Sequence, residues 1–239
     1  MTPKQRVGRL LIPRLPISRF AFDVLRNELS GLVTRAKWRL LPHLWWKRAR
    51  LRRLRGVYVN VASGGFRLDG FVHLDLHGGA PGVIRWDCCG PLPFGDNSCK
   101  GIRIEHFVEH VEPREQLPRL LADCRRALEP GGVLRIIVPD AARFAQAYCS
   151  GGEDGFAELG FKAPFPEDLP TRMDVLNHIF HQWHEHRWGY DFETLAHRLR
   201  AAGFGKVEQR RFGESADPAL ARDREQHRPY SLYVEAVKV

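Results

Sequence analysis

The sequence has few of the features that mark secreted, disulfide-stabilised or membrane-spanning chains. It contains five cysteines, an odd number, and no Cys-x-x-Cys pair, which argues against a disulfide framework. No stretch approaches the roughly 18 consecutive apolar residues of a membrane-spanning helix. The N-terminus lacks the continuous apolar segment of a secretory signal. We therefore expect a cytoplasmic protein whose thiols are free.

Internal repeats and low-complexity tracts are also absent, and acidic residues are scarce at one end of the chain. The 239 residues, 44% hydrophobic and 27% charged, are typical of one large or two small globular domains. Residues 1–56 hold 15 Lys and Arg but two acids, a net charge of +13. Residues 57–239 hold 22 basic and 26 acidic side chains, a net charge of −4. This asymmetry predicts a basic, partly helical arm over 1–56 and a separate main domain over 57–239.

The arm ends in AKWRLLPHLWWKRARLRRLR, residues 36–55, which carries eight Lys and Arg and no acid. Its apolar side chains fall near helical spacing, and Pro42 should break or kink the helix. Three interpretations stay open: a face that packs on the main domain, a surface for an anionic membrane, and a nucleic-acid-binding surface. The net charge of the main domain opposes the third. The apolar side chains concerned are Trp38, Leu41, Leu44, Trp45 and Trp46.

From Val57 onward, short apolar runs alternate with helical patterns. A helical stripe over 117–128 ends at Pro130-Gly131-Gly132, and a second helix follows the cap Asp191. The alternation predicts an α/β fold with a Rossmann-like, mostly parallel sheet of about seven strands and helices on both faces. The predicted strands are 57–62, 71–75, 82–86, 101–105, 132–139, 206–212 and 231–239.

Ligands of such sheets bind outside the carboxyl ends of the strands, so the residues that follow each strand are the candidates for a site. Glycines let a ligand approach the backbone closely, and an acid after the second strand can accept hydrogen bonds from ribose hydroxyls. Each feature is weak alone, but their order along the chain is informative. In that order they are Ser63, Gly64 and Gly65; Asp75 and Leu76; Asp87 and Cys88; and Glu105 and His106.

Two longer stretches carry a resemblance to a known family. DCCGPLPFGDNSCKGIRIEHFVEHV (87–111) and LPRLLADCRRALEPGGVLRIIVPD (117–140) resemble the class I S-adenosylmethionine-dependent methyltransferases. The resemblance covers 57–239 and implies S-adenosylmethionine as cofactor. It further implies cofactor contacts from Asn60, Ser63, Gly64, Gly65, Asp75, Leu76, Asp87, Cys88 and Glu105.

The stretch VYVNVASGGFRLDGFVHLDL (57–76) departs from the family pattern, because only 63–70 lie between the first two strands. A helical crossover needs at least about ten residues. Eight extended residues reach about 26–28 Å, more than the roughly 17 Å of a five-residue strand. We therefore predict a parallel pair without a helix, as in a shortened subgroup of bacterial methyltransferases that Asn60, Ser63, Gly64 and Asp75 match. An antiparallel hairpin is the alternative.

Histidines supply the candidate catalytic groups. We predict His106 as the base, with Glu109 or His110 orienting it and His184 or His186 as the second choice. Glu109 and His110 are equally well explained as a network that holds the fourth strand. The cluster His178, His181, His184 and His186 is open to structural hydrogen bonding, an acceptor pocket or metal binding. No metal ligand is assigned, although His181 and His184 could share a helix face.

The resemblance and these residues lead to a functional hypothesis. Residues 149–190 would form a lid over an acceptor pocket. The Asn/Asp-Pro-Pro-Tyr motif of amino-methylating enzymes is absent at 104–107, which favours a hydroxyl group as the acceptor. We therefore expect a saccharide or another small hydroxylated molecule. The subgroup's association with surface-polysaccharide genes points to polysaccharide biosynthesis. Attachment of the arm to the inner membrane face would bring the enzyme to a lipid-linked acceptor. A catalytically silent scaffold and a nucleic-acid-binding protein are the alternative functions, and the oligomeric state is open.

Overall fold

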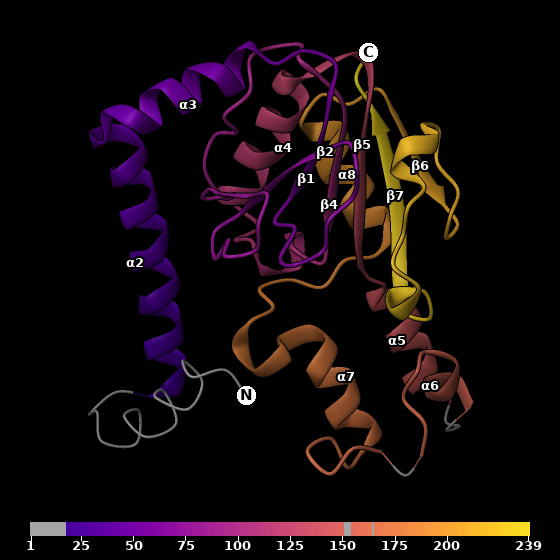
Figure 1. The fold of residues 1–239 in the computed structure, drawn as a ribbon. Helices are drawn as coiled ribbons and strands as arrows, with labels where there is room; N and C mark the ends of the chain where they lie inside the picture. The colour runs from indigo at the N-terminus through magenta and orange to yellow at the C-terminus, as the bar shows by residue number, and fades with distance from the viewer. Residues whose placement is uncertain (1–17, 151–153, 164) are drawn as a thin grey trace.

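The computed structural model describes residues 18–150, 154–163 and 165–239 (Figure 1). At its centre lies a seven-stranded sheet in the order β3-β2-β1-β4-β5-β7-β6. Neighbouring strands are parallel except where β7 pairs with β5 and β6. This order confirms the predicted Rossmann-like sheet. The strands are β1 Val57–Val61, β2 Phe71–Asp75, β3 Val83–Arg85, β4 Cys99–Glu105, β5 Leu128–Pro139, β6 Lys206–Arg210 and β7 Ser231–Val237.

The helices begin and end close to the sequence signals. The Asp191 side chain accepts from the Thr194 N–H at 2.8 Å and caps α8, as predicted. Helix α4 ends at Ala127, earlier than the Pro-Gly-Gly signal, because β5 already starts at Leu128. Within the described ranges, no helix has the length and apolarity to cross a membrane. The helices are α2 Arg19–Leu40, α3 Pro42–Arg53, α4 Gln116–Ala127, α5 Ala141–Cys149, α6 Asp154–Glu158, α7 Arg172–His181 and α8 Phe192–Ala201, with 3₁₀ turns η2 Val108–His110, η3 Gln182–His184, η4 Pro218–Leu220 and η5 Glu225–His227.

The crossover between β1 and β2 contains no helix. Tyr58 lies opposite Phe71 and Val61 opposite Leu74 in a parallel register, and 63–70 form only turns and extended chain. The predicted short crossover is confirmed, and the parallel register excludes the hairpin alternative. Gly64 adopts φ +54°, a left-handed conformation that glycine takes without strain.

The two faces of the sheet differ in chemistry. Side chains alternate across a strand, so Val59 and Val61 face one side while Tyr58 and Asn60 face the other. The first side forms the main apolar core, into which α4 and α8 bury their leucines. This core provides the hydrophobic burial that stabilises the domain. Its central strand residues are Val59, Val61, Ile102, Ile104, Leu134 and Ile136.

The second face carries polar side chains, including the fully buried Arg103 and Arg135. We expected further helices here, but residues 211–230, the connection from β6 to β7, cover this face with two 3₁₀ turns. Asp217 accepts a hydrogen bond from the Tyr58 hydroxyl at 2.8 Å, and Asp223 binds Arg135. A coil can cover this side because the sheet offers charged and hydroxyl partners rather than an apolar surface.

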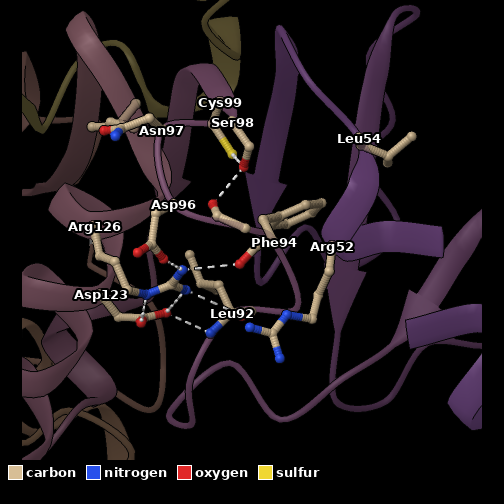
Figure 2. Close-up of polar contacts among 12 residues, drawn as sticks. Arg52, Leu54, Leu92, Phe94, Asp96, Asn97, Ser98, Cys99, Asp123 and Arg126 are labelled. Carbon is tan, nitrogen blue, oxygen red and sulfur yellow. Dashed lines mark hydrogen bonds and ion pairs between the residues drawn. The ribbon is translucent and has the colours of Figure 1, made fainter. Parts of the chain in front are cut away.

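The turn before β4 is fixed by Arg126 of α4 (Figure 2). Its guanidinium donates to Asp123 and to Asp96, each at 2.7 Å, and to the Phe94 carbonyl at 3.0 Å. Asp123 in turn accepts from the Leu92 N–H at 2.6 Å. These residues belong to the stretches that resemble methyltransferases, so part of that signature positions β4 rather than contacting a ligand.

The basic arm forms two helices that meet at Leu41, so the predicted break at Pro42 is confirmed; Pro42 itself lies in the first turn of α3. Trp38 is buried: its indole N–H donates to the Arg85 carbonyl at 2.9 Å, and its ring packs edge-on against Trp86. Leu51 of α3 is buried as well. Trp45 and Trp46 are 52% and 81% exposed, so the arm packs through only part of its apolar side chains.

Helices α5, α6 and α7 lie at the end of the sheet towards which the parallel strands run (Figure 1). They form a second, smaller core that includes Phe144, Phe156, Val175 and Ile179. Helix α7 starts with a capping box between Thr171 and Asp174. This unit closes one side of the space beyond the strand ends.

Candidate functional site

A polar cavity of about 400 Å³ lies at the carboxyl ends of β1 and β4. We refer to it as the strand-end cavity. Its floor is the loop after β1, and its walls are charged side chains from β4 and from the β6–β7 connection. The volume is within the range of small-molecule sites in proteins. The lining residues are Asn60, Ala62, Ser63, Gly64, Gly65, Phe66, Arg103, Glu105, His106 and Arg224.

Asp75 fixes the loop that forms this floor. One carboxylate oxygen accepts from the Gly64 N–H at 2.9 Å, and the other accepts from the His77 N–H at 2.8 Å. The Ser63 N–H donates to the Leu74 carbonyl at 3.0 Å, which continues the contact between β1 and β2 past the end of the strand. The carboxylate therefore sits next to the glycine turn, where the sequence placed it, although it is not among the residues that line the cavity.

Charge in the strand-end cavity is concentrated around Glu105. Arg103 Nη2 and His227 Nδ1 lie 3.0 and 3.1 Å from its carboxylate oxygens. Burial opposes ionisation of Glu105, but the His227 and Arg103 contacts outweigh it and hold the pKa of Glu105 below its ordinary value. Arg224 approaches the same carboxylate at 3.9 Å. The Phe66 ring lies under both guanidiniums, at 5.4 and 5.0 Å.

Arg103 is fully buried yet incompletely satisfied. Within the described part of the chain, its Nε and Nη2 have no hydrogen-bond partner, because Nη2 approaches Glu105 at ion-pair distance without hydrogen-bond geometry. Burial lowers the pKa of Arg103, against the effect of Glu105. The Ser63 hydroxyl is buried and unpartnered too. Buried donors without partners are uncommon in folded proteins, and beside a cavity they fit an anionic ligand.

Besides Asp75, three further predicted cofactor residues lie outside the cavity lining: Leu76, Asp87 and Cys88. Asp87 accepts from the Cys89 N–H at 3.1 Å and pairs with Arg35 of the arm helix α2. Cys88 is buried, its thiol donates to the Trp86 carbonyl, and burial raises its pKa. Five of the predicted cofactor residues thus line the strand-end cavity: Asn60, Ser63, Gly64, Gly65 and Glu105. Asp87 instead contacts the arm helix α2.

His106 lies directly after β4 with φ +49°, a conformation that is rare outside glycine and frequent at functional sites. Its Nδ1 is 3.2 Å from Glu109 Oε1 and its Nε2 is 3.0 Å from the Ser231 hydroxyl. Its ring packs against His227 with 4.1 Å between centroids. His106 lines the strand-end cavity and also a second cavity, so it forms the boundary between them.

The second cavity, of about 270 Å³, lies between η2 and α7, and we refer to it as the histidine cavity. Burial opposes ionisation of Glu109, but the His106 contact and the charges of His106 and His110 hold the pKa of Glu109 below its ordinary value. Burial lowers the pKa of His178 and of His186. The lining residues are His106, Glu109, His110, Pro139, Phe161, His178, Ile179, Gln182, His186, His227 and Tyr230.

The histidine cluster of the sequence is divided by the fold. His178 and His186 line the cavity, whereas His181 and His184 are exposed. The prediction that His181 and His184 share a helix face is wrong. Helix α7 ends at His181, and 182–184 have φ values of 35°, 55° and 77°, which turn the chain sharply.

The sequence did not indicate several residues of the two cavities, among them Arg103, Arg224, His227 and Tyr230. Arg103 left a signal, because a charged residue in the middle of the apolar run GIRIE must find partners once the strand is buried. The other three lie in a coil more than a hundred residues away from β4 in the sequence. No local pattern indicates that this coil covers the sheet.

Comparison with known proteins adds a family. Residues 76–136, from the end of β2 to the middle of β5, match the model of a family described as Methyltransferase domain. This part of the chain is therefore similar to methyltransferase domains. No curated protein sequence matches the chain.

Several solved methyltransferase structures resemble the chain at low identity. An S-adenosylmethionine-dependent methyltransferase from Archaeoglobus fulgidus is 17% identical and has a TM-score of 0.45, with 87% of this chain and 94% of that chain covered. One from Mesorhizobium loti is 20% identical, with a TM-score of 0.44 and coverages of 81% and 96%. The 1,6-didemethyltoxoflavin-N1-methyltransferase of Burkholderia thailandensis is 17% identical, with a TM-score of 0.48 and coverages of 94% and 92%.

Proposed function

We propose that the protein transfers a methyl group from S-adenosylmethionine, bound in the strand-end cavity, to an acceptor in the histidine cavity. The observation that carries this proposal is the position of His106, which borders both cavities. A donor in one cavity and an acceptor in the other would meet at this side chain. Transfer from the sulfonium is an in-line displacement, so holding the two reactants in line is the main task of the protein.

The strand-end cavity fits the amino-acid end of this cofactor. Arg103 has unpartnered buried donors and Arg224 lies beside it over the same ring, an arrangement that suits a carboxylate. The Ser63 hydroxyl is a further donor without a partner. In families with a full first crossover, the helix N-terminus after β1 supports the anionic end of a nucleotide ligand. Here two arginines on the polar face of the sheet would take that role.

The remaining cofactor contacts follow the loop and the strand ends. Asp75 holds the Gly64 turn, and its carboxylate would accept further hydrogen bonds from ribose hydroxyls. Asp87 would meet the adenine end, where Gly31 of α2 comes so close that an added Cβ would lie 3.3 Å from the Asp87 carboxylate. The arm helix would therefore form part of the wall around the base.

We infer that the acceptor is a small hydroxylated molecule, with a saccharide as the favoured class. Two polar atoms of the histidine cavity, His178 Nδ1 and Gln182 Oε1, have no hydrogen-bond partner among the described residues, and hydroxyl groups of an acceptor would satisfy them. Tyr230 and Phe161 supply ring surfaces on which a sugar can pack. When bound, the sulfonium supplies an electrophilic methyl group. His106 would accept the hydroxyl proton, and Glu109, 3.2 Å from its Nδ1, would orient the ring.

Calorimetric titration of the full chain with S-adenosylmethionine and with its demethylated product tests the cofactor part of the proposal. We expect binding of both ligands by the wild type. His106→Asn should retain binding within a few-fold and lose transfer to glycan acceptors, measured as formation of the demethylated product. Absence of binding at millimolar cofactor, with folding verified by circular dichroism, contradicts the proposal and favours the silent scaffold.

We also propose that the arm attaches the protein peripherally to an anionic membrane surface, at the inner membrane face. At the junction of α2 and α3, the exposed Leu40, Trp45 and Trp46 stand among Lys and Arg side chains, and neither Asp nor Glu occurs in 36–55. Interfacial tryptophans and cationic residues together favour an anionic bilayer, at about 1 kcal/mol per Lys or Arg near the surface.

Vesicle co-sedimentation decides this point. Because Trp38 and Leu51 are buried in the main core, deletion of the arm would disturb the fold, and point variants are the better tool. Trp45→Ala combined with Trp46→Ala should reduce sedimentation with anionic vesicles, and high salt should reduce it further. Equal sedimentation with neutral and anionic vesicles overturns the proposal, and preference for an oligonucleotide over anionic vesicles supports the nucleic-acid alternative.

A further inference from the structure

Three potential metal ligands converge on the wall of the histidine cavity. They are a carboxylate oxygen of Glu109 and one ring nitrogen each from His110 and His186, and these atoms all lie within 4.8 Å of one another. Glu109 and His110 come from the 3₁₀ turn η2, and His186 comes from the chain that follows α7. The cluster belongs to the acceptor side and includes no residue that lines the strand-end cavity.

Backbone carbonyls orient both imidazoles. The Nδ1 of His110 lies 3.0 Å from the Glu185 carbonyl, and the Nδ1 of His186 lies 2.6 Å from the Ile179 carbonyl. A carbonyl only accepts, so each Nδ1 carries the proton and each Nε2 keeps a lone pair. An outer hydrogen bond of this kind is what fixes the tautomer of histidines that bind metals.

Glu109 lacks the partners that a buried carboxylate needs. Its side chain is 2% exposed, and neither carboxylate oxygen makes a hydrogen bond with the residues that the structure describes, although His106 Nδ1 lies at ion-pair distance from one of them. Its backbone carbonyl accepts from the N–H groups of Arg187 and Trp188 at 2.6 and 3.2 Å. The last contact ties η2 to the segment that carries His186, so the ligands from the two segments are held together.

We propose that Glu109, His110 and His186 bind a divalent first-row transition metal ion. Two imidazole nitrogens and one carboxylate oxygen form the donor set of zinc sites that keep a position open for substrate. Metal bonds of about 2.0–2.2 Å place tetrahedral ligand atoms roughly 3.4 Å apart, so atoms that now lie within 4.8 Å of one another must approach by up to about 1.4 Å on binding. Rotation of the two imidazoles about their side-chain bonds supplies such a movement.

The open position of the ion faces the cavity where the acceptor binds. In this role, which rests on the proposed function, the metal ion holds an acceptor hydroxyl oxygen next to His106 and favours its ionised form. The substrate class is thereby narrowed to acceptors with a hydroxyl group that can bind a metal, above all vicinal diols, which bind through two oxygens. A ring nitrogen as the acceptor atom would leave the ion without a role.

Titration of the tag-free full chain with Co²⁺ and Zn²⁺, after treatment with a chelator, tests the site. We expect one equivalent to bind, with the visible absorption that a four- or five-coordinate Co²⁺ site gives. Even loss of an outer partner of a ligand typically costs 10–100-fold in affinity. Glu109→Gln and His186→Asn should therefore lose about 100-fold or more. His181→Asn, an exposed histidine at the end of α7, is the matched control and should bind like the wild type.

The outcomes separate this inference from the proposed function. Absence of Co²⁺ and Zn²⁺ binding by the stripped wild type, or equal binding by wild type, Glu109→Gln and His110→Asn with folding verified by circular dichroism, overturns the metal site. Titration of S-adenosylmethionine into the metal-free chain is run in parallel. If the chain binds the cofactor but no metal ion, only the metal site is contradicted. If it binds the metal ion but no cofactor, only the proposed function is contradicted.

Discussion

Arg103 on β4 and Arg135 on β5 are register partners on neighbouring strands, and both are completely buried. Each guanidinium lies over an aromatic ring, Phe66 at 5.4 Å and Tyr233 at 5.3 Å. They differ in their partners. Arg135 donates to Asp223, to Glu235 and to a backbone carbonyl, with distances between 2.6 and 3.0 Å. Arg103 has one carboxylate nearby and two nitrogens without a hydrogen bond.

The difference separates a structural charge from a charge that is available to a ligand. Every guanidinium nitrogen of Arg135 makes a hydrogen bond, and the Asp223 and Glu235 carboxylates hold the β6–β7 connection against the sheet. Arg103 faces the strand-end cavity, so a bound anion can supply what the protein does not. A buried charge without full hydrogen bonding lowers the free energy of unfolding. Such destabilising charges are found mainly at functional sites.

The largest expected effect comes from Arg135→Met. It leaves the buried carboxylate of Asp223 without its cation and leaves Arg210 as the remaining cation of Glu235. Such a break in a buried ion cluster costs about 3–5 kcal/mol in the free energy of unfolding. Denaturant unfolding followed by circular dichroism measures it. Adding Asp223→Leu and Glu235→Leu to the variant should recover most of the loss, since an apolar replacement of a whole buried ion cluster is often neutral. A triple variant as unstable as the single one contradicts this account of the cluster.

Arg103→Met should have the opposite profile. We expect a smaller loss of unfolding free energy than for Arg135→Met, because Glu105 keeps its contact with His227 at 3.1 Å. Loss of charge-assisted hydrogen bonds should weaken S-adenosylmethionine binding by about 1.5–3 kcal/mol. Calorimetry on both variants gives the two quantities. If Arg103→Met binds the cofactor as tightly as the wild type, Arg103 is not a cofactor-binding residue and differs from Arg135 only in its protein contacts.

Asp75→Ala tests the loop between the two halves of the cofactor site. The carboxylate supports the Gly64 turn and would meet ribose hydroxyls, so cofactor binding should weaken by roughly 1–3 kcal/mol. Asp69→Ala, an exposed acid in the same crossover, is the matched control and should leave affinity unchanged. Equal losses for the two variants would mean that general charge, rather than the position of Asp75, controls binding.

The smallest effect concerns His73 on β2, a buried polar group on the same face without an opposite charge beside it. Burial lowers the pKa of His73, and the charge of Arg67 lowers it further, whereas the hydrogen bond with the Leu68 backbone acts in the opposite direction. The unfolded chain therefore binds the proton more readily. The contribution of neutral His73 to the free energy of unfolding is complete above its pKa in the unfolded chain, about 6.5. It is lost as the pH falls from there through the lower pKa of the folded chain. Unfolding of wild type and His73→Gln at pH 7.5 and 5.5 measures the difference, which should be steeper in the wild type.

The sequence predicted those parts of the fold that local patterns control. The helix-free parallel crossover followed from the eight residues between two apolar runs, and the start of α8 followed from Asp191. The pairing of Arg35 with Asp87 and the path of 211–230 over the sheet could not be predicted, because they depend on contacts between segments far apart in the chain. The alternation of Tyr58 and Asn60 with three valines in β1 did indicate a polar face, but an α/β sheet is ordinarily covered by helices on both sides.

The candidate site divides in the same way. Ser63, Gly64, Asp75 and His106 follow strand ends directly, so a list of strands already places them near one another. The β6–β7 coil brings three further residues to the cavities: Arg224, His227 and Tyr230. No spacing pattern in the sequence predicts the path of this coil. His186 was proposed for its chemistry, and its position beside Glu109 and His110 became evident only from the fold.

The crossover of 63–70 also bears on how the chain folds. A parallel strand pair normally waits for a long connection to form, whereas Tyr58 and Phe71 are only 13 positions apart. The entropy lost in closing a loop grows with its length, by about 0.6 kcal/mol for each doubling. We therefore expect β1 and β2 to pair early, ahead of β5 and β7, whose partners Val133 and Val237 are more than a hundred residues apart. The glycine turn of the cofactor site would then be shaped before most of the sheet exists.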